Sequence, residues 1–156
     1  MKELHIFDLD MTLIDSSHRT QWINESEVDL NHWRKHETRE HIFKDTLLPM
    51  VNLFHFHRKS KNAIVGFCTM RGMLDCEYEF LELHSLHYDF LIHRKGEDTC
   101  IAEYKEREIK ALMSKHNIPE WRTTFYEDNP LAIERMRNIG ITVVDANVWN
   151  KEFGNG

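Results

Sequence analysis

Short apolar runs recur along the chain, and longer segments with helical spacing separate them. The runs cover residues 4–7, 63–68, 90–92, 123–126 and 141–144. A short apolar run bounded by polar residues is typical of a buried strand. Helices are expected between them, over residues 46–59, 73–84, 101–116 and 131–138. This alternation predicts an α/β fold, a Rossmann-like three-layer α/β/α sandwich with a parallel sheet of about five strands.

One region interrupts the alternation. Residues 16–44 are polar, contain Trp22 and Trp33 and several histidines, and carry no strand signal. We expect them to form a small helical insertion, similar to a cap, beside the end of the first strand. A chain of 156 residues is long enough for one hydrophobic core, so a single domain over residues 1–156 is expected.

Composition narrows the functional classes. The formal charge of −6 and the pI near 6.0 argue against binding to nucleic acid or anionic membranes through overall charge. Lysine and arginine nevertheless outnumber acids over residues 31–61, which predicts a local basic patch. Three widely spaced cysteines indicate neither a disulfide framework nor a paired-cysteine zinc site. Without a signal peptide or a long apolar run, the chain is expected to be soluble and cytoplasmic.

The first four predicted strands end in polar residues, and the carboxyl ends of parallel strands meet at one edge of a sheet. Several carboxylates at that edge repel one another unless a cation compensates them, and oxygen ligands favour Mg2+. Nearby basic side chains would form a site for an anion, so the set indicates phosphoryl transfer. The strand-end residues are Asp8 and Asp10, then Thr69 and Arg71, then His93 and Arg94, and finally Glu127, Asp128 and Asn129.

These residues resemble the motifs of the haloacid dehalogenase-like (HAD) phosphatases. The stretch DLDMT, beginning at Asp8, matches their first motif, and Thr69 in GFCTMR matches the second. Their lysine is matched by Lys105 in AEYKEREI, and their acidic motif by Glu127 and Asp128 in FYEDNP. The four motifs occur in the family's order and cover nearly the whole chain.

A second resemblance is to the 3′-phosphatase domain of bacteriophage polynucleotide kinase. It depends on the stretches DTLLPMV, RKGEDT and ERMRNIGITVV, on Thr69 with Arg71, and on Arg19. It implies a terminal 3′-phosphate of nucleic acid as substrate, in the cytoplasm of a bacterial or phage-infected cell. Two departures are Met11 in place of a glycine and Glu127 in place of an aspartate, and the latter leaves the ligand role of Glu127 open.

The resemblance implies a role for each matched residue. Asp8 would attack phosphorus and form an aspartyl-phosphate, while Asp10 would serve as general acid and base. Thr69 and Lys105 would stabilise the transferred phosphoryl group. The remaining roles are Mg2+ held by Asp8, Asp128 and the backbone carbonyl of Asp10, substrate contacts from Thr12, Arg19, Arg71 and Arg94, and support from Glu127 and Asn129.

Structural alternatives accompany these roles. Lys95 and Lys110 compete with Lys105, and the arginines could be salt-bridge partners of the acidic edge. A calcium loop beginning at Asp8 lacks the glycine and glutamate that an EF-hand requires. The pairs His32/His36 and His55/His57 lack further local zinc ligands. Trp22 and Trp33 could stack on nucleic-acid bases, although packing is the more common use of such residues.

Three functions therefore remain open. An open site beside basic residues favours a phosphorylated nucleic-acid end. The acidic net charge favours free nucleotides or other small phosphomonoesters. A binding module without catalytic activity is the alternative from another class.

Overall fold

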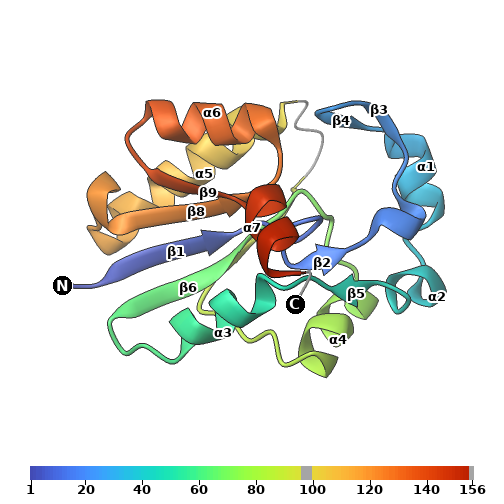
Figure 1. The fold of residues 1–156 in the computed structure, drawn as a ribbon, viewed down its shortest axis with the longest axis horizontal. Helices are drawn as coiled ribbons and strands as arrows, with labels where there is room; N and C mark the ends of the chain where they lie inside the picture. Colours follow the sequence, from blue (N-terminus) through green and yellow to red (C-terminus); the bar gives the residue numbers. More distant parts are fainter. Residues whose placement is uncertain (96–99, 155–156) are drawn as a thin grey trace.

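The computed structural model describes residues 1–95 and 100–154. Its centre is a five-stranded parallel sheet with strand order β7-β6-β1-β8-β9 (Figure 1). The predicted α/β sandwich is confirmed. The strands of this sheet are β1 (Glu3–Phe7), β6 (Ala63–Cys68), β7 (Leu91–Ile92), β8 (Thr123–Glu127) and β9 (Thr142–Asp145).

Helices cover both faces of the sheet. The helices of the chain are α1 (Leu30–Lys35), α2 (Arg39–Ile42), α3 (Val51–Arg58), α4 (Asp75–Leu83), α5 (Ile101–His116), α6 (Pro130–Asn138) and α7 (Ala146–Phe153), with short 3-10 turns η1 (Ser17–Arg19) and η2 (Glu120–Arg122). Helices α3, α4 and α7 pack on one face, and α5 and α6 pack on the other.

Alternation along each strand divides the core between these faces. Phe7 faces α3 and stacks on Tyr126, with 3.9 Å between the ring centroids, and Phe54 of α3 meets it edge-on. Ile6 points the other way, into the cluster that contains Ile109 of α5. Successive side chains of a strand point to opposite faces, so β1 supplies both halves of the core.

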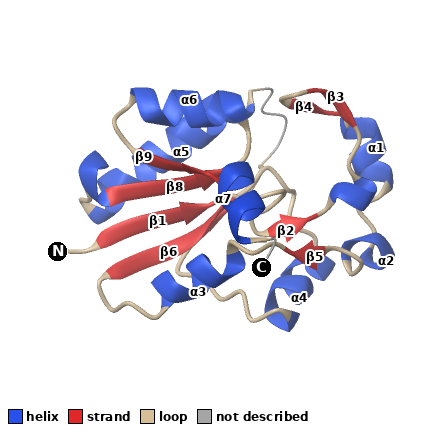
Figure 2. Cartoon of the chain, in the orientation of Figure 1, coloured by secondary structure: helices blue, strands red, loops and turns tan. Residues whose placement is uncertain are grey.

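Between β1 and α3, residues 14–47 contribute nothing to the central sheet. They lie beyond the carboxyl ends of its strands (Figure 2). Besides α1 and α2, this 14–47 segment holds two small antiparallel pairs, β2 (Ile14–Asp15) with β5 (Thr46–Leu47), and β3 (Trp22–Asn24) with β4 (Glu27–Val28). The insertion therefore contains helices, as expected, and in addition two strand pairs that were not expected. These strands have two or three residues each, too few for an alternating pattern to be visible.

Several predicted boundaries also differ. The helix expected from residue 46 begins at Val51, because Thr46 and Leu47 pair with β2 and Pro49 disfavours helical geometry before it. Helix α4 begins at Asp75, after Met73 adopts a left-handed φ of 49°. Helix α7 was not predicted. Asp145 caps it by accepting hydrogen bonds from the amides of Asn147 and Val148.

No helix in the described part of the chain is both long and apolar enough to cross a membrane.

Candidate active site

The central strands end beside one another and bring three carboxylates together. Asp8 follows β1, Glu127 ends β8, and Asp128 follows it. The amide of Asp8 donates to the carbonyl of Tyr126 at 2.9 Å, which fixes the two strand ends together. One carboxylate oxygen of each acid lies within 4.8 Å of the others. We call Asp8, Glu127 and Asp128 the acidic cluster.

Burial makes this cluster costly in the absence of a cation. Asp8 and Glu127 are buried, while Asp128 is partly exposed. Burial, reinforced by the charge of Glu127, raises the pKa of Asp8 to about 7. Burial and the charges of Asp8 and Glu127 raise the pKa of Asp128 to about 11. Three ionised carboxylates therefore do not coexist here easily, and a divalent cation would relieve their repulsion.

Lys105 reaches the cluster from the first half of α5. Its Nζ donates to Asp8 Oδ1 at 2.9 Å and to Glu127 Oε2 at 2.6 Å. Although burial alone would lower the pKa of Lys105, these two acids raise it well above its ordinary value. Lys110, one of the alternatives, is exposed and pairs with Glu106. The structure thus places Lys105, and not Lys110, beside Asp8.

Glu127 organises the loop that carries Asp128. Its Oε1 accepts from the backbone amides of Asp128 and Asn129, both at 3.1 Å, while its Oε2 binds Lys105. Both oxygens are therefore already engaged. The longer side chain thus ties α5 to the turn after β8, and Asp128 is the more accessible acid of the pair.

Two threonines lie at the ends of β1 and β6. Thr12 Oγ1 donates to Asp8 Oδ2 at 3.1 Å. Thr69 is fully buried, and its Oγ1 accepts from the amide of Arg71 at 3.1 Å. Phe7 pairs with Phe67 in the sheet, so Asp8 and Thr69 follow neighbouring strand ends.

Asp10 is held apart from the acidic cluster. Arg71 binds it at two points, with Nε at 2.9 Å from Oδ2 and Nη2 at 2.6 Å from Oδ1. Ser16 Oγ donates to the same carboxylate at 2.9 Å. Burial would raise the pKa of Asp10, but the charge and hydrogen bonds of Arg71 outweigh it and lower the pKa.

Two of the arginines expected at the substrate are buried in ion pairs. Arg19 binds Asp45 through Nε at 3.0 Å and Nη2 at 2.9 Å, and its guanidinium lies 4.1 Å from the ring centroid of Trp33. Arg71 also reaches Asp45, at 3.2 Å. In this structure both guanidinium groups hold protein carboxylates instead of facing an open cavity. Trp33 packs on Arg19, whereas Trp22 is exposed.

Arg94 and Asn129 occupy the rim. The amide of Arg94 donates to the carbonyl of Arg71 at 3.1 Å, and its side chain is partly buried. Residues 96–99 of the RKGEDT stretch lie outside the described residues. Asn129 caps α6, and its Nδ2 donates to the carbonyl of Ser26 at 3.1 Å. This hydrogen bond connects the β3–β4 hairpin to the loop of the acidic cluster.

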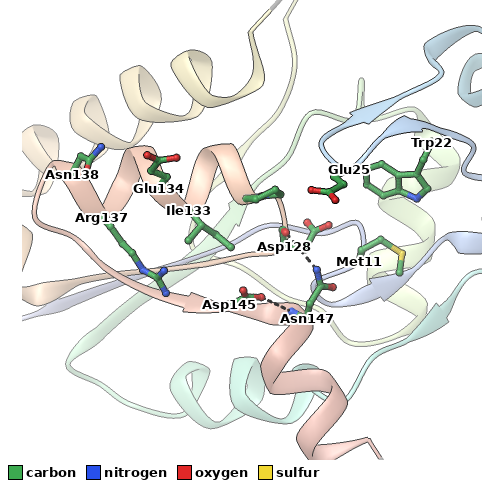
Figure 3. Close-up of a pocket in the computed structure, with 11 residues that line it drawn as sticks. Met11, Trp22, Glu25, Asp128, Ile133, Glu134, Arg137, Asn138, Asp145 and Asn147 are labelled. Atoms are coloured by element: carbon green, nitrogen blue, oxygen red, sulfur yellow. Dashed lines mark hydrogen bonds between the residues drawn. The ribbon is translucent and has the colours of Figure 1, made fainter.

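A groove of about 720 Å³ opens beside the acidic cluster (Figure 3). Met11, Trp22 and Glu25 form one wall, and α6, Asp145 and Asn147 form the other. Asp128 lies between them. The groove therefore reaches the acidic cluster at Asp128.

The side chains present fit a hard divalent cation. The cluster offers several carboxylate oxygens and no sulfur or imidazole, which suits Mg2+. The raised pKa values of Asp8 and Asp128 show that their ionised forms are destabilised here, and a bound divalent cation would remove this destabilisation. Asp8 and Asp128 are the ligands we would assign, because Glu127 is occupied by Lys105 and two amides.

Comparison with known proteins gives the family. Residues 1–92 match the family described as bacteriophage T5 5′-deoxynucleotidase. The chain belongs to this family. The 5′-deoxynucleotidase of Escherichia phage T5 is 36% identical over 85 residues, which is 52% of this chain and 34% of that protein. The chain therefore spans about a third of the length of this curated relative.

Solved structures confirm the fold predicted from the HAD motifs. A haloacid dehalogenase-like hydrolase from Streptococcus pneumoniae superposes with a TM-score of 0.65 and 15% identity, over 92% of this chain and 84% of that one. A chain of the Pnkp1/Rnl/Hen1 RNA repair complex superposes with a TM-score of 0.59 and 16% identity, over 92% of this chain and 42% of that one. A HAD-superfamily hydrolase from Geobacter sulfurreducens superposes with a TM-score of 0.64 and 14% identity, over 93% of this chain and 89% of that one.

The match to the T5 deoxynucleotidase family covers only part of the site. Asp8, Asp10, Thr12 and Thr69 lie within residues 1–92, but Lys105 and the acidic pair at 127–128 do not. The parallel pairing of β1 with β8 brings residues 127–128 beside Asp8, and Lys105 reaches Asp8 from α5.

Sequence reasoning missed three residues of this member of the family. Asp45 joins Arg19 to Arg71, and Glu25 and Asn147 line the groove. Asp45 follows a helix in a polar stretch, and nothing in its local pattern distinguishes it from an exposed acid. Only its tertiary contacts with Arg19 and Arg71 give it a role.

Proposed function

We propose that this protein is a Mg2+-dependent phosphatase that releases phosphate from nucleoside monophosphates. The observation that carries the proposal is the setting of Asp8. Its carboxylate is buried beside Lys105, Thr12 and Asp128, and Asp128 in turn lines a groove open to solvent. Membership of the T5 5′-deoxynucleotidase family supports a nucleotide as the substrate.

In the proposed reaction, Asp8 acts as nucleophile. Its carboxylate oxygen attacks phosphorus as the bond to the leaving oxygen breaks, which gives an aspartyl-phosphate. Water then attacks phosphorus, and phosphate leaves with Asp8 restored. Lys105 and Thr69 would stabilise the negative charge of the phosphoryl oxygens, and bound Mg2+ would supply further charge neutralisation.

Asp10 would deliver a proton to the leaving oxygen and take one from the attacking water. In the structure it is a carboxylate held by Arg71 and Ser16, the state required for the second of these steps. For the first step it must carry a proton, so we propose that its pair with Arg71 loosens when substrate binds.

A terminal 3′-phosphate on nucleic acid is the second candidate, supported by the fold likeness to the Pnkp1/Rnl/Hen1 complex. The distribution of charge weighs against it. The basic residues of 31–61 divide between the region of α1 and α2, residues 34–44, and the far end of α3, where Arg58, Lys59 and Lys61 line a separate hollow at the start of β6. The expected basic patch is therefore not one surface beside the site.

The test compares phosphate release from deoxynucleoside 5′-monophosphates and from 3′- and 5′-phosphorylated oligonucleotides, with Mg2+ and with EDTA. We expect the monophosphates to react fastest, and Asp8→Asn to lower the rate by at least about 10⁴-fold. Asp75→Asn, an exposed acid on α4, is the matched control. Faster reaction of the 3′-phosphorylated oligonucleotide would favour the second candidate, and no release from any substrate would favour a binding module.

A further inference from the structure

The groove beside the acidic cluster has the position of a subsite for the rest of the substrate. Asp128 belongs both to the cluster and to the groove lining. Met11, which follows Asp10 directly, lines it as well. A phosphoryl group at Asp8 would therefore leave its remaining part in this groove.

Trp22 offers this groove an aromatic surface. It lies on β3 of the hairpin and is 45% exposed, so its ring is not needed to fill the core. Figure 3 shows its indole on the wall opposite Ile133, with Asp128 between them. An exposed aromatic ring in such a groove stacks readily on a nucleobase.

The charge of the groove limits what else can bind. Apart from Asp128, its lining contains the carboxylates of Glu25, Glu134 and Asp145 and the guanidinium of Arg137. Additional phosphates of a nucleoside diphosphate, triphosphate or oligonucleotide would lie among like charges. A nucleoside is uncharged and carries several donors for the carboxylates, so it suits this lining.

We propose that the groove selects mononucleotides, with the base stacked on Trp22 and the acidic lining rejecting further phosphates. This inference rests on the proposed phosphatase function and adds to it the recognition of the base. It assigns Trp22 as a residue that determines specificity, with no part in the chemical step.

The first experiment separates base recognition from phosphate chemistry. Deoxynucleoside 5′-monophosphates are compared with 2-deoxyribose 5-phosphate, which lacks the base. We expect Trp22→Ala to lower kcat/KM for the nucleotides by about 5- to 100-fold. The kcat/KM for the sugar phosphate should change by less than about twofold. Trp22→Phe should recover most of the loss, and Trp121→Ala, an exposed tryptophan outside the groove, is the control.

The second experiment tests the charges. The double variant Glu25→Gln, Glu134→Gln should narrow the preference for a monophosphate over the corresponding diphosphate by at least about threefold. Because salt screens exposed charges, the wild-type preference should also decrease as ionic strength rises.

The outcomes distinguish the two proposals. If the wild-type protein hydrolyses 2-deoxyribose 5-phosphate but Trp22→Ala affects both substrates equally, base recognition by Trp22 is wrong and the phosphatase function stands. An unchanged preference in the charge variant overturns the role of the acidic lining. If neither substrate is hydrolysed, the phosphatase function itself fails.

Discussion

At the scale of single residues, Lys105 is the cation on which two buried acids depend. Removing it leaves Asp8 and Glu127 close together without compensation. We expect Lys105→Gln to lower the free energy of unfolding by about 3–5 kcal/mol in EDTA, measured by urea denaturation. Lys110→Gln on the exposed side of α5 should change it by less than about 0.5 kcal/mol. Equal stability of the two variants would contradict the importance of the buried pairs.

The candidate site residues differ in how well the sequence predicts their positions. The placement of Asp8, Thr69 and Asp128 at one edge of the sheet could be predicted, because each directly follows a strand and parallel strands place their carboxyl ends together. The buried positions of Arg19 and Arg71 could not, since they depend on Asp45, distant from both in the chain. Met11, noted as an unusual residue, takes a φ of 61°, the left-handed geometry that favours glycine.

At the scale of elements, the same contrast applies. Helix α5 was predicted with its observed bounds because it is long and amphipathic. The β3–β4 hairpin and the β2–β5 pair were missed because their strands are too short to show a period. Helix α7 was missed because it follows β9 without an intervening loop: Asp145 is both the last residue of the strand and the cap of the helix, so no turn signal separates the two elements.

Asn129 connects two elements, and its two functions can be separated. Its Oδ1 caps α6 and its Nδ2 holds Ser26 of the hairpin turn. Serine can retain the cap but cannot donate in the same way. We expect Asn129→Ala to cost about 1 kcal/mol in urea denaturation and Asn129→Ser appreciably less. Both should raise KM for nucleotides, and an unchanged KM would show that the hydrogen bond to Ser26 does not matter for binding.

A histidine pair between β1 and α3 predicts acid sensitivity. His5 stacks on His57 with ring centroids 3.7 Å apart, Tyr126 Oη contacts both rings, and Glu3 lies 3.1 Å from His5. Burial, with the charge of His5, lowers the pKa of His57 to about 4. The imidazole of His57 is therefore harder to protonate in the folded protein than in the unfolded chain.

The stabilisation from these neutral rings is complete above the unfolded pKa of about 6.5 and is lost as pH falls towards 4. We expect the free energy of unfolding of the wild type to fall between pH 7.5 and pH 5, and that of His57→Gln to fall less. His87→Gln, on an exposed histidine, is the control. Parallel pH profiles for wild type and His57→Gln would contradict this assignment.

At the scale of the whole molecule, the acidic cluster should couple stability to metal binding. An ion that binds only the folded state, at about 100 times its dissociation constant, adds about 2.7 kcal/mol. For a chain of this size, that corresponds to a rise in Tm of roughly 5–10 °C. We expect Mg2+ to produce this rise in the wild type and to have little effect on Asp128→Asn.

The pH dependence in EDTA provides the check. An acid whose pKa is raised in the folded state stabilises it at low pH, and that stabilisation is lost as pH rises towards the folded pKa. The Tm of the wild type relative to Asp128→Asn should therefore decrease as pH rises from about 4 towards the folded pKa of Asp128, about 11. A constant difference between the two proteins would contradict the repulsion inferred within the cluster.

The buried ion pairs of Arg19, Asp45, Arg71 and Asp10 also bear on how a substrate enters and leaves. Arg71, which follows β6, binds Asp45 of the 14–47 segment, and Ser16 of the segment donates to Asp10, so the base of the segment is joined to the strand ends at two points. At the outer end, a hydrogen bond from Asn129 to Ser26 joins the hairpin to α6. Moving the whole 14–47 segment away from the sheet would expose the buried ion pairs to solvent. Moving the hairpin turn alone would break the neutral hydrogen bond between Asn129 and Ser26. Substrate entry and product release should therefore depend on a small, fast bending of the β3–β4 hairpin. The exchange of product for substrate does not require a slow rotation of the whole 14–47 segment.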